Sequence, residues 1–318
     1  MKEMISTRAA YGKTLKKCGA ENKDIVVLDA DLSCCTMTND FAEAYPDRFY
    51  NVGIAECNMV GIAAGMAACG KIPFVNSFAM FTAGRAYDQI RNSVCYPKLN
   101  VKITGSHGGL SIGEDGATHQ CIEDFALMRV IPGMTVVCPC DAYETEQAVK
   151  AIEEYNGPVY MRTGRLAIEN VTPGIKDYHF KLGKGVQLKN GKDAAIIAAG
   201  MMVQEALKAA DTLEKEGISV RVIDMHTIKP LDTDIIKKAA DDTGFIVTTE
   251  EHNVIGGLGS AVCEFLSEYQ NVRVVKHGVM DTFGRSGKAL DVLKAYGLTA
   301  DDIAETVREN INIGKNEQ

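Results

Sequence analysis

Short apolar runs rich in β-branched residues alternate with longer stretches of helical periodicity through the first half of the chain. Continuous apolar runs are typical of parallel strands that are buried on both faces. They predict strands at residues 25–28, 49–52, 74–78, 101–104, 135–138 and 159–162, and helices at 7–18, 57–69, 83–95 and 143–155. This order of elements predicts a doubly wound α/β domain with a mostly parallel sheet.

The pattern is interrupted near the middle of the chain. Residues 166–193 contain Pro, Gly and Lys but no long apolar period, so we place a linker at 171–191. A second alternation then predicts strands at 194–199, 219–223, 245–249 and 272–275, and helices at 203–216, 234–240, 258–269 and 300–310. We therefore expect two α/β domains, at residues 1–170 and 192–318, of which the second is smaller.

The composition is that of an ordinary globular protein, with 46% hydrophobic and 24% charged residues among 318. These values exclude disordered, collagen-like and membrane-spanning classes. The 34 Lys and Arg against 42 Asp and Glu give a net charge of -8, which disfavours nucleic acid or an anionic membrane as partner. The chain starts without an apolar signal segment, and its ten cysteines form no CxxC pair. We expect a cytoplasmic protein with reduced thiols and no metal site of its own.

Polar and aromatic residues gather where the predicted strands of the first domain end, and these ends meet at one edge of a parallel sheet. Glu56 lies between an apolar strand and a helix that opens with small apolar residues. Burial would raise the pKa of its carboxyl and let it exchange a proton near neutrality. The alternative is a first-turn glutamate favoured by the helix dipole. Phe78 and Phe81 are either core residues or a stacking platform for a planar heterocycle.

The loop from His107 to His119 is the richest in chemistry. It contains four glycines, which let the backbone approach a ligand closely, and Asp115 lies between the two histidines. Imidazole and carboxylate groups at these positions favour a site for a polar small molecule with hydroxyl groups. A purely structural loop and a metal site remain alternatives, although the spacing of the histidines matches no zinc motif.

Taken together, these loops resemble transketolase. The resemblance follows the order of essentially the whole chain and rests on NVGIAECNM at 51–59, SFAMF at 77–81, GSH at 105–107, SIGEDGATHQ at 111–120, RTGR at 162–165, TIKPLD at 227–232 and RSGK at 285–288. It covers only the pyrimidine-binding and C-terminal domains. The Gly-Asp-Gly…Asn motif with which single-chain members hold the cofactor's diphosphate and metal does not occur in the sequence.

The resemblance therefore implies the C-terminal-section subunit of a split transketolase. Its partner would be an N-terminal-section subunit, in a heterotetramer with two copies of each chain. The implied cofactor is thiamine diphosphate, shared with that partner, which would also hold Mg2+ or Ca2+. The implied reaction moves a two-carbon ketol unit from a ketose phosphate to an aldose phosphate, as in the pentose phosphate pathway.

The resemblance also assigns residues to the cofactor. Glu56 matches the glutamate that hydrogen-bonds the aminopyrimidine ring and activates the cofactor. Phe81 matches the aromatic residue that stacks on that ring, with Phe78 beside it. Asp31 and Leu32 match residues that line the cofactor.

The remaining assignments concern the sugar. His107 and His119 match histidines that contact sugar hydroxyls and the reacting carbonyl oxygen, and Asp115 matches the acid that reads the donor's hydroxyl stereochemistry. Arg8 and Arg165 match, together with His107, the clamp for the sugar phosphate. The planar fork of arginine donors suits that role.

Two positions depart from the family pattern. Cys35 stands where the phosphate clamp usually has a serine hydroxyl, although Ser33 is nearby, and Gly84 stands where many members have an aromatic residue near the cofactor. The RAYDQ motif at 85–89 is shared with deoxyxylulose-phosphate synthase, and the β subunit of 2-oxo-acid dehydrogenases is a further alternative. The long SIGEDGATHQ loop favours transketolase over both. A non-catalytic regulatory subunit is the remaining alternative, and the intact site residues speak against it.

Overall fold

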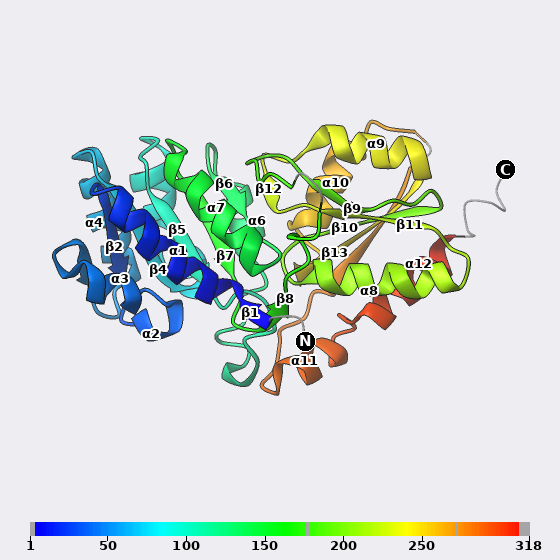
Figure 1. Cartoon of the computed structure of the whole chain (residues 1–318), viewed down its shortest axis with the longest axis horizontal. Helices are drawn as coiled ribbons and strands as arrows, with labels where there is room; N and C mark the ends of the chain where they lie inside the picture. Colours follow the sequence, from blue (N-terminus) through cyan, green and yellow to red (C-terminus); the bar gives the residue numbers. More distant parts are fainter. Residues whose placement is uncertain (1–3, 176–177, 271, 312–318) are drawn as a thin grey trace.

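The computed structural model describes residues 4–175, 178–270 and 272–311. Two α/β units, each a sheet with helices on both faces, lie side by side along the long axis of the molecule (Figure 1). The α/β architecture with mostly parallel sheets that the sequence predicts is confirmed. Within the described ranges, no helix combines the length and apolarity needed to cross a membrane.

The first sheet has seven strands in the order β12-β6-β7-β5-β4-β2-β3. Six of them are mutually parallel: β2 (Ile25–Asp29), β3 (Phe49–Asn51), β4 (Ile72–Phe78), β5 (Lys102–Ser106), β6 (Thr135–Val137) and β7 (Val159–Thr163). Every residue of β2, β5 and β7 is buried, as expected for the central strands of a parallel sheet covered on both faces.

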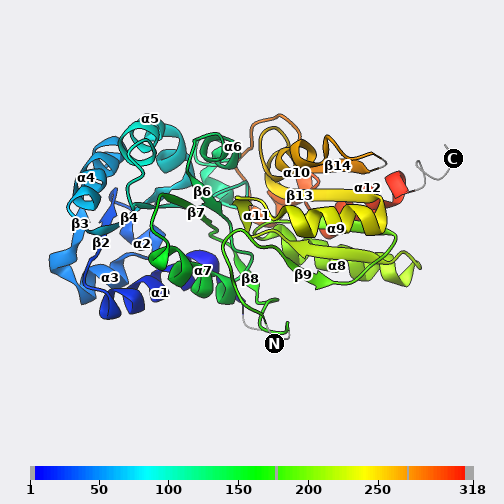
Figure 2. The ribbon, with the colours of Figure 1, turned by 90° about the horizontal axis from the view of Figure 1, so that it is seen from above.

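Alternate residues of these strands pack into two different cores. Ile25 and Val27 pack with α1 (Thr7–Glu21), α3 (Asn39–Ala44) and α7 (Ala142–Glu154), whereas Val26 and Leu28 pack with α4 (Glu56–Ala68) and α6 (Asp124–Arg129). Figure 2 shows the two groups of helices on opposite faces of the sheet. The remaining short elements are α2 (Ser33–Thr36), η1 (Pro46–Arg48) and η4 (Gly113–Asp115).

The helix predicted at 83–95 has a different form. It begins at residue 80 and consists of two π-helical segments around a short α-turn: η2 (Met80–Arg85), α5 (Tyr87–Gln89) and η3 (Ile90–Cys95). Apolar spacing does not separate i→i+4 from i→i+5 hydrogen bonding, so the sequence could not reveal this. Such π segments occur frequently at functional sites.

The second sheet has the order β14-β13-β10-β11-β9. Its strands are β9 (Val186–Lys189), β10 (Ala194–Ala198), β11 (Val220–Asp224), β13 (Phe245–Asn253) and β14 (Arg273–Val279). Helices α8 (Met202–Lys215) and α12 (Ala300–Ile311) cover one face, and α9 (Thr233–Thr243) and α10 (Leu258–Leu266) cover the other (Figure 1). Helix α11 (Ala289–Ala295) packs near η4.

The predicted linker at 171–191 contains strand β9, which pairs antiparallel with β11. Its residues are only half-buried and two of its four are polar, so the strand has no continuous apolar signal. Here the structure differs from the predicted linker: the second sheet begins before residue 192.

The two halves share structure along their contact. Strand β12 (Thr227–Lys229) belongs to the second half of the chain but pairs antiparallel with β6 of the first sheet. Strand β1 (Met4–Ser6) pairs with β8 (Ala167–Glu169), just before the predicted linker. One apolar core contains both Cys138 and Ile228 and so extends across this contact. The two halves therefore pack against each other through a shared apolar core.

Candidate active site

The candidate site lies at the carboxyl edge of the first sheet. The register places Phe78 beside Ser106 and Ser106 beside Thr163, so β4, β5 and β7 end in one row. Strand β3 lies on one side of β2 and β4 on the other, which makes the β2–β4 junction a point where the strand order reverses. Open parallel sheets bind their ligands at such a reversal, beyond the carboxyl ends of the strands.

Glu56 is the first residue of α4, and its side chain is 1% exposed. Its Oε2 accepts a hydrogen bond from Arg85 Nη1 at 2.7 Å, and its Oε1 accepts one from Ser77 Oγ at 3.3 Å. The burial expected from the sequence is present. The arginine partner was not expected, and it offsets the cost of burying the carboxylate.

An aromatic group lies next to this carboxylate. The rings of Phe78 and Phe81 are 5.9 Å apart with an interplanar angle of 20°, and His119 stands edge-on to Phe81 at 5.2 Å. The Arg85 guanidinium lies 4.5 Å from the centre of the Phe81 ring. Phe81 is only half-buried, so it is not a fully enclosed core residue.

His107 connects the aromatic group to the predicted phosphate clamp. Its ring is 4.2 Å from that of Phe78, its Nε2 is 3.1 Å from Arg8 Nη1, and its Nδ1 is 2.8 Å from Ser106 Oγ. Burial, with the nearby charges of Arg8 and Arg165, lowers the pKa of His107 to about 3. The ring is therefore neutral near pH 7. Because arginine only donates, Nε2 accepts and Nδ1–H donates to Ser106.

The two arginines of the predicted clamp lie on either side of this histidine. Arg8 Nη1 donates to the Cys35 carbonyl at 2.9 Å, while its Nε is buried without a partner. Arg165 Nη1 donates to the Ile112 carbonyl at 2.6 Å and lies 3.3 Å from the Glu114 carboxylate. Burial, with a smaller contribution from the positive charge of Arg165, lowers the pKa of both Arg8 and His107, so two arginines lie on either side of a neutral imidazole.

Three predicted residues lie on the same rim without joining these groups. Asp31 has a left-handed backbone (φ 65°) and accepts from Asn51 Nδ2 at 2.9 Å. The Leu32 amide donates to a buried aspartate at 2.6 Å, and Asp115 is exposed at the end of η4. Within the described part of the chain, no hydrogen bond or ring contact joins them to Glu56 or His107. Their assigned roles stay predictions.

Family comparison accounts for this arrangement. The pyrimidine binding domain of transketolase matches residues 3–170, and the C-terminal domain of transketolase matches residues 183–303. The chain belongs to the transketolase family. It corresponds to the C-terminal section of a transketolase, as the sequence predicts.

Three relatives illustrate the match. A protein of Methanocaldococcus jannaschii, provisionally named as a transketolase C-terminal section, is 49% identical over 96% of each chain. One of the apulose-4-phosphate transketolase subunits of Phocaeicola vulgatus is 41% identical over 96% of this chain and 97% of that one. A solved structure described as "Split gene transketolase, inactive beta4 tetramer" has a TM-score of 0.89 and 52% identity, and covers 98% of this chain and 99% of that chain.

The structure of this transketolase section adds residues that the sequence analysis did not assign. Arg85 pairs with Glu56, and Ser106 holds the His107 ring. Arg85 stood in the RAYDQ segment, but its distance of 29 residues from Glu56 gave no sign of the contact. Ser106 directly precedes His107 in the sequence, but the sequence does not show that the Ser106 hydroxyl points toward the imidazole of His107. The structure shows this contact.

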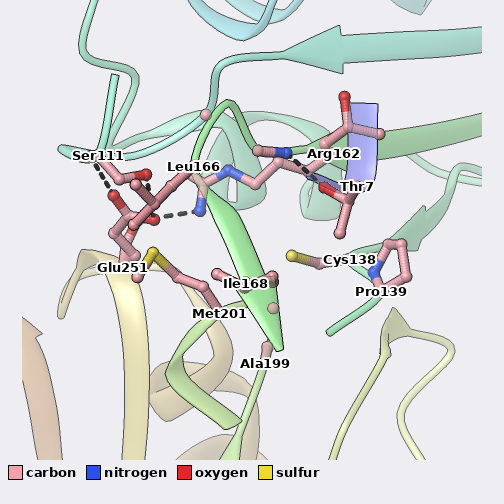
Figure 3. A pocket seen from close by; sticks show the side chains of 14 residues that line it. Thr7, Ser111, Cys138, Pro139, Arg162, Leu166, Ile168, Ala199, Met201 and Glu251 are labelled. Atoms are coloured by element: carbon pink, nitrogen blue, oxygen red, sulfur yellow. Dashed lines mark hydrogen bonds between the residues drawn. The ribbon is translucent and has the colours of Figure 1, made fainter. Parts of the chain in front are cut away.

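A third such residue comes from the C-terminal domain. Glu251 of β13 accepts hydrogen bonds from the amide and the hydroxyl of Ser111, in the loop that carries Asp115 and His119. Figure 3 shows this pair on the wall of a small cavity at the contact between the domains, with Arg162 and Thr7 nearby. The cavity holds about 30 Å³, which suffices for about one water molecule and not for a sugar.

Proposed function

We propose that this chain is the C-terminal subunit of a split, thiamine-diphosphate-dependent transketolase. It transfers a two-carbon ketol unit from a ketose or ketose phosphate to an aldose or aldose phosphate. The observation that carries the proposal is the convergence of three groups on one rim: the buried Glu56 carboxylate, the Phe78–Phe81 rings, and His107 with its arginines. Each group suits a different part of the reaction.

The residues fit the pyrimidine half of the cofactor. Phe81 offers a half-exposed ring face, and Glu56 offers a carboxylate a short distance behind it. Of the residues that the structure describes, only Ser77 donates to Glu56 Oε1, so this oxygen retains a lone pair for a protonated ring nitrogen. When bound, thiamine diphosphate supplies an electron sink for cleavage of a carbon–carbon bond next to a carbonyl. In this proposal Glu56 holds the proton that the pyrimidine ring exchanges.

The other groups fit the sugar. His107 is neutral, so its role is to orient an oxygen by hydrogen bonding and not to supply charge. Arg8 keeps a buried Nε–H without a partner, and Arg165 lies within its electrostatic reach. Both can donate to a terminal phosphate. His119 and Asp115 lie on the rim above and are available to sugar hydroxyls, with His119 next to the carbonyl oxygen of the substrate.

The proposal includes a partner. An N-terminal-section subunit would bind the diphosphate through Mg2+ or Ca2+, and two copies of each chain would form a heterotetramer in the cytoplasm. Two relatives support this: one is named as a single subunit of a transketolase, and the other comes from a split gene and forms a β4 tetramer that is described as inactive. The substrates are proposed as sugar phosphates of the pentose phosphate pathway, although one relative is named for apulose 4-phosphate.

The test is reconstitution. The purified chain alone should show no ketol transfer between xylulose 5-phosphate and ribose 5-phosphate, and addition of the N-terminal-section subunit, thiamine diphosphate and Mg2+ should produce it. In the reconstituted enzyme, Glu56→Gln should lower kcat by orders of magnitude, because Gln cannot hold the exchanging proton. Full activity of the isolated chain would overturn the split-subunit proposal. Pyruvate acting in place of the ketose donor would overturn the assigned reaction.

A further inference from the structure

A second cluster of reactive side chains lies away from the candidate active site, where the two domains meet. Cys140 directly precedes the N-cap of α7, Glu144 lies in the first turn of that helix, and Asp224 ends strand β11 of the second sheet. One potential ligand atom of each lies within 4.8 Å of those of the other two, and all three side chains are fully buried.

Hydrogen bonds of the backbone hold the segments that carry these three residues next to each other. The Cys138 amide donates to the His226 carbonyl at 2.8 Å, which holds the segment before α7 against the segment after β11. Gln204 Nε2 of α8 donates to the Cys140 carbonyl at 2.7 Å. The cluster is thus held by elements of both domains, and its members do not depend on a flexible surface loop.

The cluster contains polar atoms that have no partner. Among the described residues, no group meets hydrogen-bonding geometry with either carboxylate oxygen of Asp224, although the Glu144 carboxylate and the Cys140 thiol lie beside it, and none does so with Nε2 of the nearby His226. A neighbouring carboxylate, Asp141, differs: it accepts from the amides of Glu144, Val171 and Thr172 and from the Thr172 hydroxyl. The fold therefore satisfies one buried carboxylate completely and leaves the next one open.

The charges around Glu144 and Asp224 also favour a bound cation. Among described residues, no ion pair reaches Glu144 or Asp224. A buried carboxylate without a cation or donor is costly, and a bound cation removes that cost. Glu144 is also oriented for a ligand: Oε2 accepts from the Cys140 amide at 2.6 Å and Oε1 accepts from the Tyr178 hydroxyl, which leaves one lone pair on each oxygen.

We propose that Cys140, Glu144 and Asp224 form a binding site for a divalent transition-metal ion, of which Zn2+ is the best match. A thiolate with two carboxylates favours a borderline-soft ion over Mg2+ or Ca2+, which prefer oxygen ligands. Three protein ligands leave a fourth position, which a water molecule can fill. Binding releases the thiol proton to solvent. The ion would link the two domains, because Asp224 belongs to the second sheet and Cys140 and Glu144 to the first domain.

The test is direct metal binding by the full chain. After chelation and reloading with Zn2+, the chain should retain one metal ion through gel filtration, measured by mass spectrometry of the elements. Loading with Co2+ should produce a sulfur-to-cobalt charge-transfer band in the near ultraviolet. Cys140→Ser should abolish the band, and Asp224→Asn should weaken Zn2+ binding at least tenfold. Cys138→Ser, on the same segment but outside the group, is the matched control and should bind as the unaltered chain does.

Two outcomes would overturn the proposal. One is that the unaltered chain binds neither ion, or that the cobalt band persists in Cys140→Ser. The other is that Asp224→Asn raises the thermal stability of metal-free and Zn2+-loaded chain equally, which would identify Asp224 as a buried carboxylic acid that holds its own proton. The unaltered chain gives a decisive result even if one variant fails to fold. None of these measurements depends on transketolase activity.

Discussion

Arg85 donates a hydrogen bond to Glu56 Oε2 at 2.7 Å and at the same time lies over the Phe81 ring at 4.5 Å. One side chain thus joins the carboxylate proposed to exchange a proton with the ring proposed to stack on the pyrimidine. The Glu56 side chain is 1% exposed and that of Arg85 is 47% exposed. The pair is therefore intermediate between a buried and a surface ion pair, and its coupling energy should be intermediate as well.

Removal of Arg85 alone should destabilise the protein more than removal of both charges. Arg85→Ala leaves Glu56 buried and unpaired, and we expect a loss of about 1–3 kcal/mol in the free energy of unfolding, below the ~3–5 kcal/mol of fully buried pairs. Glu56→Gln combined with Arg85→Ala should recover most of it, since neutral Gln needs no cation. Urea denaturation of the four proteins gives the coupling energy. Strictly additive losses would contradict a direct ion pair.

Much of the fold could be predicted because the signals were local. Most strands of the first sheet were found from short apolar runs. Strand β12 was missed because its three residues pair with a strand about ninety positions earlier. The residues next to Thr227 in the sequence give no sign of this pairing.

The candidate site divides in the same way. Glu56, Phe78 and His107 follow strand ends and could be found from the sequence. Their orientation could not, because it depends on partners far along the chain: Arg8 is 99 residues from His107, and Glu251 is 140 residues from Ser111. The proposed metal site could not be found from the sequence either, because Asp224 belongs to the second domain whereas Cys140 and Glu144 belong to the first.

Glu251 should act as a positioning residue for the loop that carries His119 and Asp115. Glu251→Ala removes both acceptors for Ser111, and we expect the KM of the ketose donor in the reconstituted enzyme to rise about tenfold, with thiamine diphosphate binding little changed. Gly109→Ala should act similarly, because its backbone is left-handed (φ 82°) and a Cβ there would overlap the Glu251 carboxyl. Glu251→Gln keeps one acceptor and should lie between. An unchanged donor KM in Glu251→Ala would contradict this role.

Asp141 should be a major contributor to stability. Its carboxylate caps α7 and also accepts from the Val171 amide, the Thr172 amide and the Thr172 hydroxyl. Asp141→Ala leaves these buried donors without partners, and we expect a loss of at least about 3 kcal/mol, more than the ~1 kcal/mol of an ordinary N-cap. Asp141→Asn retains one acceptor and should lose less. Equal unfolding midpoints for Asp141→Ala and the unaltered chain would contradict the assignment.

His107 and His252 should contribute less stability as the pH falls below about 6.5. Burial lowers the pKa of His107 to about 3 and that of His252 to about 4, whereas an unfolded histidine titrates near 6.5. Between these values the unfolded chain binds protons that the native chain does not. The stability that these two histidines contribute is therefore complete above about pH 6.5 and falls as the pH decreases, by up to about 1.4 kcal/mol per pH unit for each. Glu250, whose pKa burial raises to about 7, contributes with the opposite sign below that pH, so the net slope is smaller than the sum for the two histidines.

Urea denaturation at pH 7.5, 6.5 and 5.5 measures this slope. NMR of histidine ring protons provides the site-specific control, because the signals of His107 and His252 should not move in that range. Titration of His107 near pH 6 in the native chain would contradict the neutral, hydrogen-bonded state on which its proposed role depends.

Cys35→Ser should increase the preference for phosphorylated sugars. Arg8 donates to the Cys35 carbonyl, so residue 35 lies beside the proposed phosphate clamp. A thiol donates hydrogen bonds weakly, whereas a serine hydroxyl next to a dianion contributes roughly 1.5 kcal/mol or more. We expect the KM of ribose 5-phosphate to fall about tenfold in the reconstituted enzyme, with that of an unphosphorylated aldose unchanged. Cys34→Ser, the exposed neighbour, is the matched control and should change neither value. An equal change for both acceptors would place residue 35 outside the clamp, and its side chain would then have no part in distinguishing phosphorylated substrates.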